Sequence, residues 1–519
     1  MNHWLGRACL AVAACVLSLT AAAEILTAKV TGGRVQGVAA SNVAAFKGIP
    51  FAVPPVGELR WQKPQPVAAW QGVRAADAFG PSCIQDPAML TFAQAPPGVS
   101  EDCLYLNVWT PAQSARERLP VMVWIYGGGF AIGTTGSALY DGTRLAEKRV
   151  VLVSVAYRVG AFGFLAHPEL SRESGKGSGN YGLQDMIAGL QWVRDNIGAF
   201  GGDPGNVTIF GESAGGIAVS MLAASPYAKG LFHKAISESG GSFAPSRRAT
   251  EGGQNVPTLA VAEAVGEQFL GKLGAASIVA GRALPAQQIQ QAQGPGLAGG
   301  FWPVDDGDVL PGDQYVLYSE GRFNETPVLI GSNSDEGALF IRGGVTRAAF
   351  EEQIRAGYGE HADELLAVYP HATDAEAVQA ARDVFRDFAF AWPTWTWARL
   401  QSAKGRGAAY VYYFDHRTPQ SPNGASHADE MPYVFRNLGG ATRPEDIAMS
   451  DLVSTYWTNF AKTGDPNGAG LPQWPAFSEK SQQVMFLDAA SSARPVPNVA
   501  QLEAFEAYYA WRREQAQAR

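Results

Sequence analysis

One short stretch, residues 207–216, constrains this chain more than any other. Val207 to Phe210 are apolar and predict a buried strand, and the residues after Ser213 predict a helix. Between them lies the pattern G-x-S-x-G, in which glycines two positions before and after a serine permit a turn tight enough to expose its Oγ. The free N–H groups at the start of the helix also favour negative charge near Ser213. The stretch therefore predicts a nucleophilic serine at a strand-to-helix turn.

Several further apolar runs predict a large, mostly parallel sheet. Near-continuous apolar runs at residues 119–126 and 150–157 are typical of strands buried on both faces. Two more strands are expected at 327–331 and 408–414, and apolar residues near helical spacing predict a helix at 181–197. Strands that alternate with helices indicate right-handed crossovers and an α/β fold with helices on both faces of the sheet.

Other segments are expected to surround this sheet. Residues 28–37 alternate apolar and polar side chains around glycines and predict a hairpin, whereas 46–50 and 54–61 lead into or contain prolines and are expected to be irregular. Residues 345–403 are mostly helical in pattern and predict a cap-like region. Residues 280–300 are rich in Ala, Gly and Gln and are expected to form an exposed loop.

The first 23 residues have the pattern of a secretion signal. Arg7 supplies a positive charge, residues 8–19 an apolar region, and three alanines at 21–23 a cleavage site. We expect a secreted or periplasmic mature chain in which residues 24–519 form one domain. The alternative is lipid attachment at Cys15, where a lipoprotein-like pattern ends, although the apolar run continues beyond it. No later run reaches the roughly 18 apolar residues of a membrane-spanning helix.

Charge and cysteine content narrow the classes of partner. The chain has 40 Lys and Arg against 48 Asp and Glu, which argues against nucleic acid or an anionic membrane as the main partner. Cys83 and Cys103 remain once the signal is removed, and an even pair in an exported chain predicts a disulfide. A metal site is the alternative, but two cysteines without a nearby histidine make a poor zinc set. We expect neither a metal nor a cofactor.

The residues that a serine nucleophile needs occur in the expected order. Such a serine requires a histidine to take its proton, an acid to orient that histidine, and N–H donors for the oxyanion. In the α/β-hydrolase arrangement the order is serine, acid, histidine. The acidic segment 332–337 follows one predicted strand, and His427 follows the next. Upstream, Gly127–Gly129 follow a buried strand and allow the close backbone approach that an oxyanion site requires.

These motifs resemble the type B carboxylesterases, the family that includes cholinesterases and bacterial para-nitrobenzyl esterases. Residues 101–107 and 200–216 resemble the two signatures of that family, and the similarity runs from about residue 35 to 511. The resemblance implies an α/β-hydrolase fold and a serine carboxylic-ester hydrolase that works through an acyl-enzyme on Ser213. It implies His427 as the general base and Glu336 as the orienting acid.

The resemblance also implies further site residues. Asp335 is the alternative acid and His416 the alternative histidine. The oxyanion donors map to the N–H groups of Gly128, Gly129 and Ala214. Glu212 and Ser239 match positions that support the catalytic residues. The disulfide of the family maps to Cys83 and Cys103. Pocket positions map to Phe92, Trp302, Phe388 and Phe390.

The resemblance and the aromatic residues together predict the kind of substrate. An aromatic-lined gorge favours an uncharged, bulky or aromatic small-molecule ester. Residues 84–102 contain no tryptophan to hold a quaternary ammonium, so a choline ester is not expected. An amidase or lipase with the same catalytic residues is an alternative function. A catalytically inactive binding protein is another, but such relatives usually lose the serine or the histidine.

Overall fold

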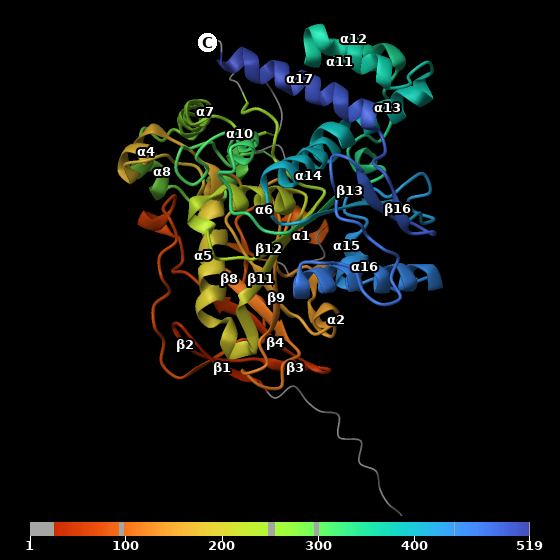
Figure 1. The fold of residues 1–519 in the computed structure, drawn as a ribbon. Coiled ribbons are helices and arrows are strands. Elements are labelled where there is room, and N and C mark those ends of the chain that lie inside the picture. The colour runs from red at the N-terminus through yellow and green to blue at the C-terminus, as the bar shows by residue number, and fades with distance from the viewer. Residues whose placement is uncertain (1–24, 93–97, 248–254, 295–299, 441, 518–519) are drawn as a thin grey trace, which may run out of the picture.

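The structure, a computed structural model, describes residues 25–92, 98–247, 255–294, 300–440 and 442–517. An 11-stranded mixed sheet runs through it in the order β16-β15-β14-β13-β12-β11-β9-β10-β8-β4-β3 (Figure 1). The strands are β3 (Val38–Ala40), β4 (Val43–Pro50), β8 (Tyr105–Thr110), β9 (Leu119–Ile125), β10 (Val151–Val155), β11 (Gly202–Glu212), β12 (Lys234–Glu238), β13 (Val328–Asn333), β14 (Ala409–Phe414), β15 (Gln483–Leu487) and β16 (Ser492–Pro495).

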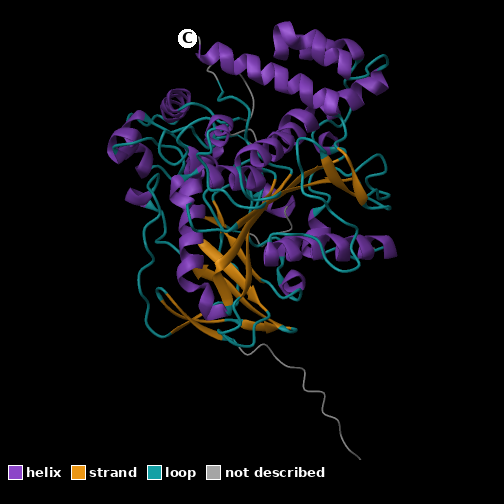
Figure 2. Ribbon diagram, viewed as in Figure 1, coloured by secondary structure: helices purple, strands orange, loops and turns teal. Residues whose placement is uncertain are grey.

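The middle of this sheet is parallel and its margins are antiparallel. The strands from β10 to β15 pair in parallel with their neighbours, whereas β8, β4, β3 and β16 pair antiparallel. Every residue of β10, β12 and β13 is buried, as expected for strands covered on both faces. The prediction of a large, mostly parallel sheet is confirmed. Figure 2 shows the sheet twisting through the middle of the molecule between its helices.

Helices cover both faces of the sheet. The helices α5 (Tyr181–Asn196) and α6 (Ala214–Ala224) lie against one face, and α2 (Thr143–Ala146) and α16 (Pro444–Thr463) against the other (Figure 1). All residues of α6 are buried, which fits a helix that is apolar on every side. Because α6 begins directly after the predicted nucleophile, its position in the core fixes the position of Ser213.

A group of helices follows β13 in the chain, and the last of them packs against β13 and β14. Residues 345–403 form α11 (Arg347–Tyr358), α12 (Ala362–Val368), α13 (Asp374–Arg386), the π-helical turn η8 (Asp387–Ala391) and α14 (Trp392–Lys404), so the predicted helical region is confirmed. The long helix α17 (Val499–Gln517) lies beside α11 and α12 (Figure 1). Further α-helices include α1 (Ala88–Phe92), α3 (Gly160–Phe164), α4 (Pro168–Ser174), α7 (Leu259–Lys272), α10 (Gln314–Ser319) and α15 (Met431–Phe435).

Small sheets complete the fold. The strands β1 (Thr27–Val30) and β2 (Gly33–Gln36) pair antiparallel, so the predicted hairpin is confirmed, and β5 (Val73–Ala75) pairs with β2. The short strands β6 (Ser82–Cys83) and β7 (Val99–Ser100) form a separate pair. In the part of the chain that the structure describes, no helix combines the length and apolar character needed to cross a bilayer.

Two sequence-based expectations about local structure are wrong. Residues 46–50 belong to β4, because burial of Phe46 and Ile49 in the main sheet outweighs the proline. Pro50 is the last residue of that strand, where its missing N–H costs little. Residues 280–294 are not an exposed loop, because α8 (Ile278–Ala283) and α9 (Ala286–Ala292) occupy most of them and Ile289 is fully buried. Alanine and glutamine are good helix formers, and Ser277 caps α8; residues 295–299 lie outside the described part.

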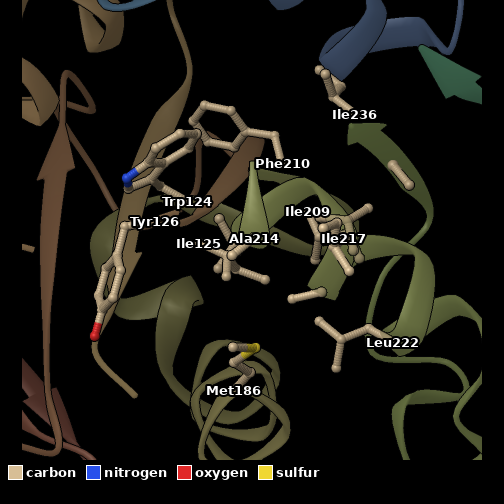
Figure 3. Close-up of a cluster of buried hydrophobic side chains, with 14 of the residues drawn as sticks. Trp124, Ile125, Tyr126, Met186, Ile209, Phe210, Ala214, Ile217, Leu222 and Ile236 are labelled. Atoms are coloured by element: carbon tan, nitrogen blue, oxygen red, sulfur yellow. The ribbon is translucent and has the colours of Figure 1, made fainter. Parts of the chain in front are cut away.

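A tightly packed aromatic and aliphatic core supports the turn that carries Ser213. Figure 3 shows side chains from the ends of β9 and β11 gathered around the start of α6. The ring of Trp124 lies 4.9 Å from that of Phe210 and 5.0 Å from that of Phe435. Since interiors are packed as densely as organic crystals, this core leaves the strand ends little freedom to move.

Candidate active site

The chain reverses direction sharply at Ser213, between β11 and α6. Ser213 has φ 56° and ψ −126°, a conformation that costs a residue with a side chain on the order of 1–3 kcal/mol. A Cβ atom on Gly215 would lie 2.0 Å from the carbonyl oxygen of Ile125, and one on Gly211 would lie 2.5 Å from the carbonyl carbon of Gly215. Both glycines are therefore required by close packing. The half-buried Ser213 side chain lines a cavity.

Backbone N–H groups gather beside this serine. Gly128 and Gly129 follow β9 with φ 106° and 61°, and Ala214 is the first residue of α6. Gly128, Gly129 and Ala214 all line the same cavity as Ser213. Among the residues that the structure describes, their N–H groups have no hydrogen-bond acceptor. These three donors are therefore placed where they can bind a negatively charged oxygen of a ligand.

His427 lies between two buried carboxyl groups. Its Nδ1 is 2.6 Å from Oε2 of Glu336, and its Nε2 is 3.2 Å from Oε1 of Glu212. Glu212 directly precedes Ser213, so this second contact places Nε2 next to the turn. The structure records no hydrogen bond between the Ser213 hydroxyl and any described residue.

Glu336 is held by three hydrogen bonds. Besides the contact with His427, its Oε1 accepts hydrogen bonds from the hydroxyl of Ser239 at 2.6 Å and from the backbone N–H of Asn333 at 2.7 Å. Glu336 is fully buried. A carboxylate that accepts this many hydrogen bonds cannot rotate away, so it fixes the orientation of the His427 ring.

The alternative acid and the alternative histidine lie elsewhere. The Asp335 carboxylate is 3.5 Å from the guanidinium of Arg382, and no hydrogen bond joins it to His427 among the described residues. His416 contacts Asp446 through Nε2 at 2.8 Å and does not line the cavity at Ser213. Both therefore belong to other polar clusters.

The charges around His427 shift its acid–base properties. Burial lowers the pKa of the imidazole, but the carboxylates of Glu212 and Glu336 outweigh this effect and raise it to about 9. Burial raises the pKa of Glu212 to about 7, partly opposed by His427 and reinforced by Glu336. A proton can therefore reside on either His427 or Glu212, and the two groups titrate as a pair.

Two further buried carboxyl groups interact electrostatically with Glu212. Glu238 accepts a hydrogen bond from Nε1 of Trp457 at 2.7 Å, and Glu430 accepts one from the side-chain amide of Asn333. Burial raises the pKa of Glu238 to about 8 and that of Glu430 well above its usual value, and the other carboxylates add to both effects. We call Glu212, Glu238, Glu336 and Glu430 the carboxylate cluster. Glu238 and Glu430 were not among the site residues predicted from the sequence, although Glu238 directly precedes Ser239 and Glu430 follows His427 by three residues.

A cavity of about 1810 Å³ lies against the turn, and Glu212, Ser213 and His427 are part of its lining. Trp302, Phe388 and Phe390 line it, as do Phe340 and Phe385, which the sequence analysis did not identify. The ring of Phe390 stacks on that of His427 with a centroid separation of 4.6 Å, and the ring of Phe340 is 5.2 Å away. The region next to the histidine is thus aromatic. Phe92 is the last residue of α1, but its side chain lies outside the described part of the structure.

The remaining sequence-based expectations concern the two cysteines, metal-binding side chains and the N-terminal signal. Cys83 and Cys103 form a disulfide, as predicted. Within the described ranges, no group of three or more His, Cys, Asp or Glu side chains has the geometry of a metal site. The predicted secretion signal, residues 1–23, lies outside the described residues.

Comparison with known proteins identifies the family of this chain. The sequence profile of the carboxylesterase family matches residues 22–505. The chain belongs to the carboxylesterase family. Like the nucleophile turn, the predicted family signatures lie within this match, so the resemblance inferred from the motifs is confirmed.

Individual carboxylesterases match over nearly the whole chain. The fumonisin B1 esterase of Sphingopyxis macrogoltabida is 38% identical over 472 residues, which cover 88% of this chain and 85% of the relative. The para-nitrobenzyl esterase of Bacillus subtilis (strain 168) is 36% identical over 476 residues, which cover 88% of this chain and 94% of the relative. A solved structure named PNB esterase matches with a TM-score of 0.80 and 34% identity over 92% of this chain and 99% of its own. This carboxylesterase therefore has the α/β-hydrolase fold.

Proposed function

We propose that this carboxylesterase is an exported serine hydrolase of carboxylic esters that acts through an acyl-enzyme on Ser213. The observation that carries the proposal is the meeting, in one cavity, of the strained Ser213 turn, the His427–Glu336 pair and three backbone N–H donors. Each of these parts has a role in acyl transfer to serine.

The chemistry follows from their positions. Ser213 Oγ attacks the ester carbonyl while His427 Nε2 takes the hydroxyl proton, and the N–H groups of Gly128, Gly129 and Ala214 stabilise the resulting oxyanion. His427 returns the proton to the leaving alcohol as the carbon–oxygen bond breaks. A water molecule then attacks the acyl-enzyme by the same route and releases the acid. Glu336 keeps Nδ1 protonated and stabilises the imidazolium, while Ser239 positions Glu336.

The cavity favours bulky or aromatic esters. Its volume of about 1810 Å³ exceeds the roughly 300–1,000 Å³ of an ordinary small-molecule pocket. Phe340 and Phe390 flank His427, and Trp302 and Phe388 extend the aromatic surface. One relative is named for fumonisin B1 and another for para-nitrobenzyl esters, and the second name describes an aromatic ester.

Labelling and mutation of the serine test this assignment. An organophosphonate should label Ser213 alone, as located by peptide mass spectrometry, and Ser213→Ala should abolish labelling. The substitution should also lower kcat for para-nitrophenyl butyrate by several orders of magnitude, as loss of a triad residue does in other serine hydrolases. Ser242→Ala is a suitable control, because Ser242 lines the same cavity but is given no chemical role. Normal turnover by Ser213→Ala would refute the proposal.

Export is proposed from the signal-like N-terminus together with the Cys83–Cys103 disulfide, since disulfides persist mainly in oxidising compartments. Mass spectrometry of the protein purified from its native host should give an N-terminus near Glu24. A lipid-modified Cys15 would indicate anchoring instead, and a retained Met1 would contradict export.

A further inference from the structure

The charged residues that line the cavity differ from those of the whole chain. The chain has more acidic than basic residues, 48 against 40. Among the described residues that line the cavity, however, the acidic side chain is Glu212, whereas four are arginines: Arg144, Arg247, Arg342 and Arg512. Glu212 lies at the buried end against His427. The remainder of the lining is therefore positive or neutral.

Arg342 lies on the segment that runs from Glu336, the proposed catalytic acid, past the aromatic side chains that line the cavity, which we call the aromatic wall. The 3₁₀ turn η6 (Glu336–Leu339) leads to Phe340, whose ring is near His427, and Arg342 follows two residues later. Arg342 is exposed, its Nε donates to the carbonyl oxygen of Leu339, and it forms no ion pair with a described residue. Its charge is therefore available to a ligand in the cavity.

Arg144 belongs to a different part of the lining. It lies in α2, and its guanidinium donates to the carbonyl oxygen of Arg436 at 3.2 Å. The neighbouring Asn437 also lines the cavity and donates to the carbonyl oxygen of Leu139 at 2.9 Å. Arg144 is exposed and forms no ion pair with any residue that the structure describes. Two separate segments thus bring a guanidinium to the cavity without a bound carboxylate.

We propose that this carboxylesterase acts on esters that carry a carboxylate or another anionic group away from the ester bond, and that Arg342 and Arg144 bind that group. Arginine presents several donors in a planar fork that matches a carboxylate. Clefts lined by charges of one sign also raise the local concentration of oppositely charged ligands. Arg247 and Arg512 have interactions of their own, so we assign no binding role to them.

The proposal deepens the proposed function and rests on it. The aromatic side chains next to Ser213 and His427 would bind the uncharged part of the substrate, while the arginines would bind its charged end. The aromatic residues alone predict uncharged esters. The substrate class inferred from the cavity is instead a bulky ester with a remote negative charge.

Matched pairs of esters measure this preference. One series consists of mono-para-nitrophenyl esters of diacids from succinate to suberate, each compared with the monoacid ester of equal chain length. A second series places the charge on the alcohol side, with butyryl esters of ω-hydroxy acids and of the matching simple alcohols. For each pair, the quantity to determine is kcat/KM of the anionic ester divided by that of the neutral ester.

The double variant Arg342→Gln/Arg144→Gln should lower this ratio on the order of 10-fold in at least one series, because interactions between complementary charges accelerate association and stabilise the complex. Neutral esters should be hydrolysed at nearly the wild-type rate. The wild-type ratio should also fall as sodium chloride rises from 20 to 500 mM, since salt screens exposed charges.

Arg116→Gln/Lys480→Gln is a matched control. Both residues are exposed and precede the amino ends of β9 and β15, whereas the cavity lies at the carboxyl ends of the strands. The control should leave every ratio unchanged. The proposal is overturned if the double arginine variant changes the ratios no more than the control in both series. If the wild-type enzyme hydrolyses none of these esters, the proposed function itself is refuted.

Discussion

The two sides of the His427 ring differ in almost every physical property. On one side a wide cavity is lined by aromatic rings and by arginines. On the other side Glu238, Glu336 and Glu430 of the carboxylate cluster are closed to solvent, each at most 1% exposed, while Glu212, the fourth member, also lines the cavity. The first side consists largely of loops and of the helical region 345–403. In the carboxylate cluster, Glu212 and Glu238 end β11 and β12, Glu336 begins η6, and Glu430 directly precedes α15.

This difference separates two kinds of function. The carboxylate cluster orients and charges the imidazole, so a change there should affect every substrate alike. In the proposed function the cavity wall contacts the parts of the substrate that do not react, so a change there should alter the choice between substrates. Substitutions on the two sides of the ring should therefore have different effects on activity.

Removing the charge of Glu336 should be the most damaging change in the carboxylate cluster. Glu336→Gln should lower kcat by about 10²- to 10⁴-fold for all esters, because the amide neither fixes the histidine tautomer nor stabilises the imidazolium. Asp335→Asn is the matched control and should cost far less, because Asp335 faces Arg382. Steady-state kinetics on acetyl and benzoyl esters would measure the loss of kcat in both variants. A greater loss in Asp335→Asn would show that the acid is misassigned.

Glu212→Gln should shift the pH dependence of kcat/KM. Burial alone lowers the pKa of His427, and Glu212 and Glu336 raise it to about 9. Because the catalytic base must be neutral, removing the Glu212 charge should lower the pKa of His427. The rising limb of the pH profile of kcat/KM should then move toward lower pH by about one unit. The exposed Glu503 provides the control Glu503→Gln. A limb that stays in place, or moves toward higher pH, would contradict the role of Glu212.

Glu238→Gln should make the stability of the protein less sensitive to pH. Burial raises the pKa of Glu238 in the folded state from 4.5 to about 8. Between these values the folded protein keeps a proton that the unfolded chain has lost, so this group reduces stability as pH rises, by up to about 1.4 kcal/mol per pH unit. The amide can still accept the hydrogen bond from Trp457. In thermal unfolding at pH 5, 6.5 and 8, the melting temperature of Glu238→Gln should decline less with rising pH than that of the wild type. The control Glu503→Gln should decline as the wild type does.

The smallest effect is expected at the aromatic wall. Phe388→Ala should enlarge the cavity and change the ratio of kcat/KM for benzoyl and acetyl esters by about 3- to 10-fold, with a smaller effect on the acetyl ester alone. Phe486→Ala truncates an aromatic side chain on β15 that does not line the cavity and should leave the ratio unchanged. An equal loss of rate for both esters would place Phe388 with the residues that support the chemistry.

Local sequence patterns predict the sheet and the nucleophile turn because each pattern reports a local requirement. The buried strands are continuous apolar runs, and the turn at Ser213 needs glycine at fixed positions. The same reasoning fails for residues 46–50, where pairing of β4 with β8 decides the structure. It also fails for 280–294, where the composition was read as a loop although the residues favour helix.

The site could be predicted only in part from the sequence, for a related reason. Glu336 and His427 follow two consecutive predicted strands, so chain order and the family resemblance indicate them. Glu430, Phe340 and Arg342 have no recognisable pattern of their own. Glu430 contacts Asn333 and Phe340 lies near His427, both distant in the sequence, and the position of Arg342 at the cavity follows from the fold. Their properties depend on tertiary packing, which local spacing does not encode.

The glycines at the turn have a consequence for laboratory evolution of this enzyme. A single added methyl group on Gly215, Gly211 or Gly127 would lie within 2.6 Å of backbone atoms, and neighbouring backbone has no space into which to move. These positions are effectively closed to mutation, whereas exposed cavity positions such as Arg144 and Arg342 can accept many side chains. Variant libraries should therefore reach new substrates by changing the wall in single steps, while the hydrolytic reaction itself is inherited unchanged.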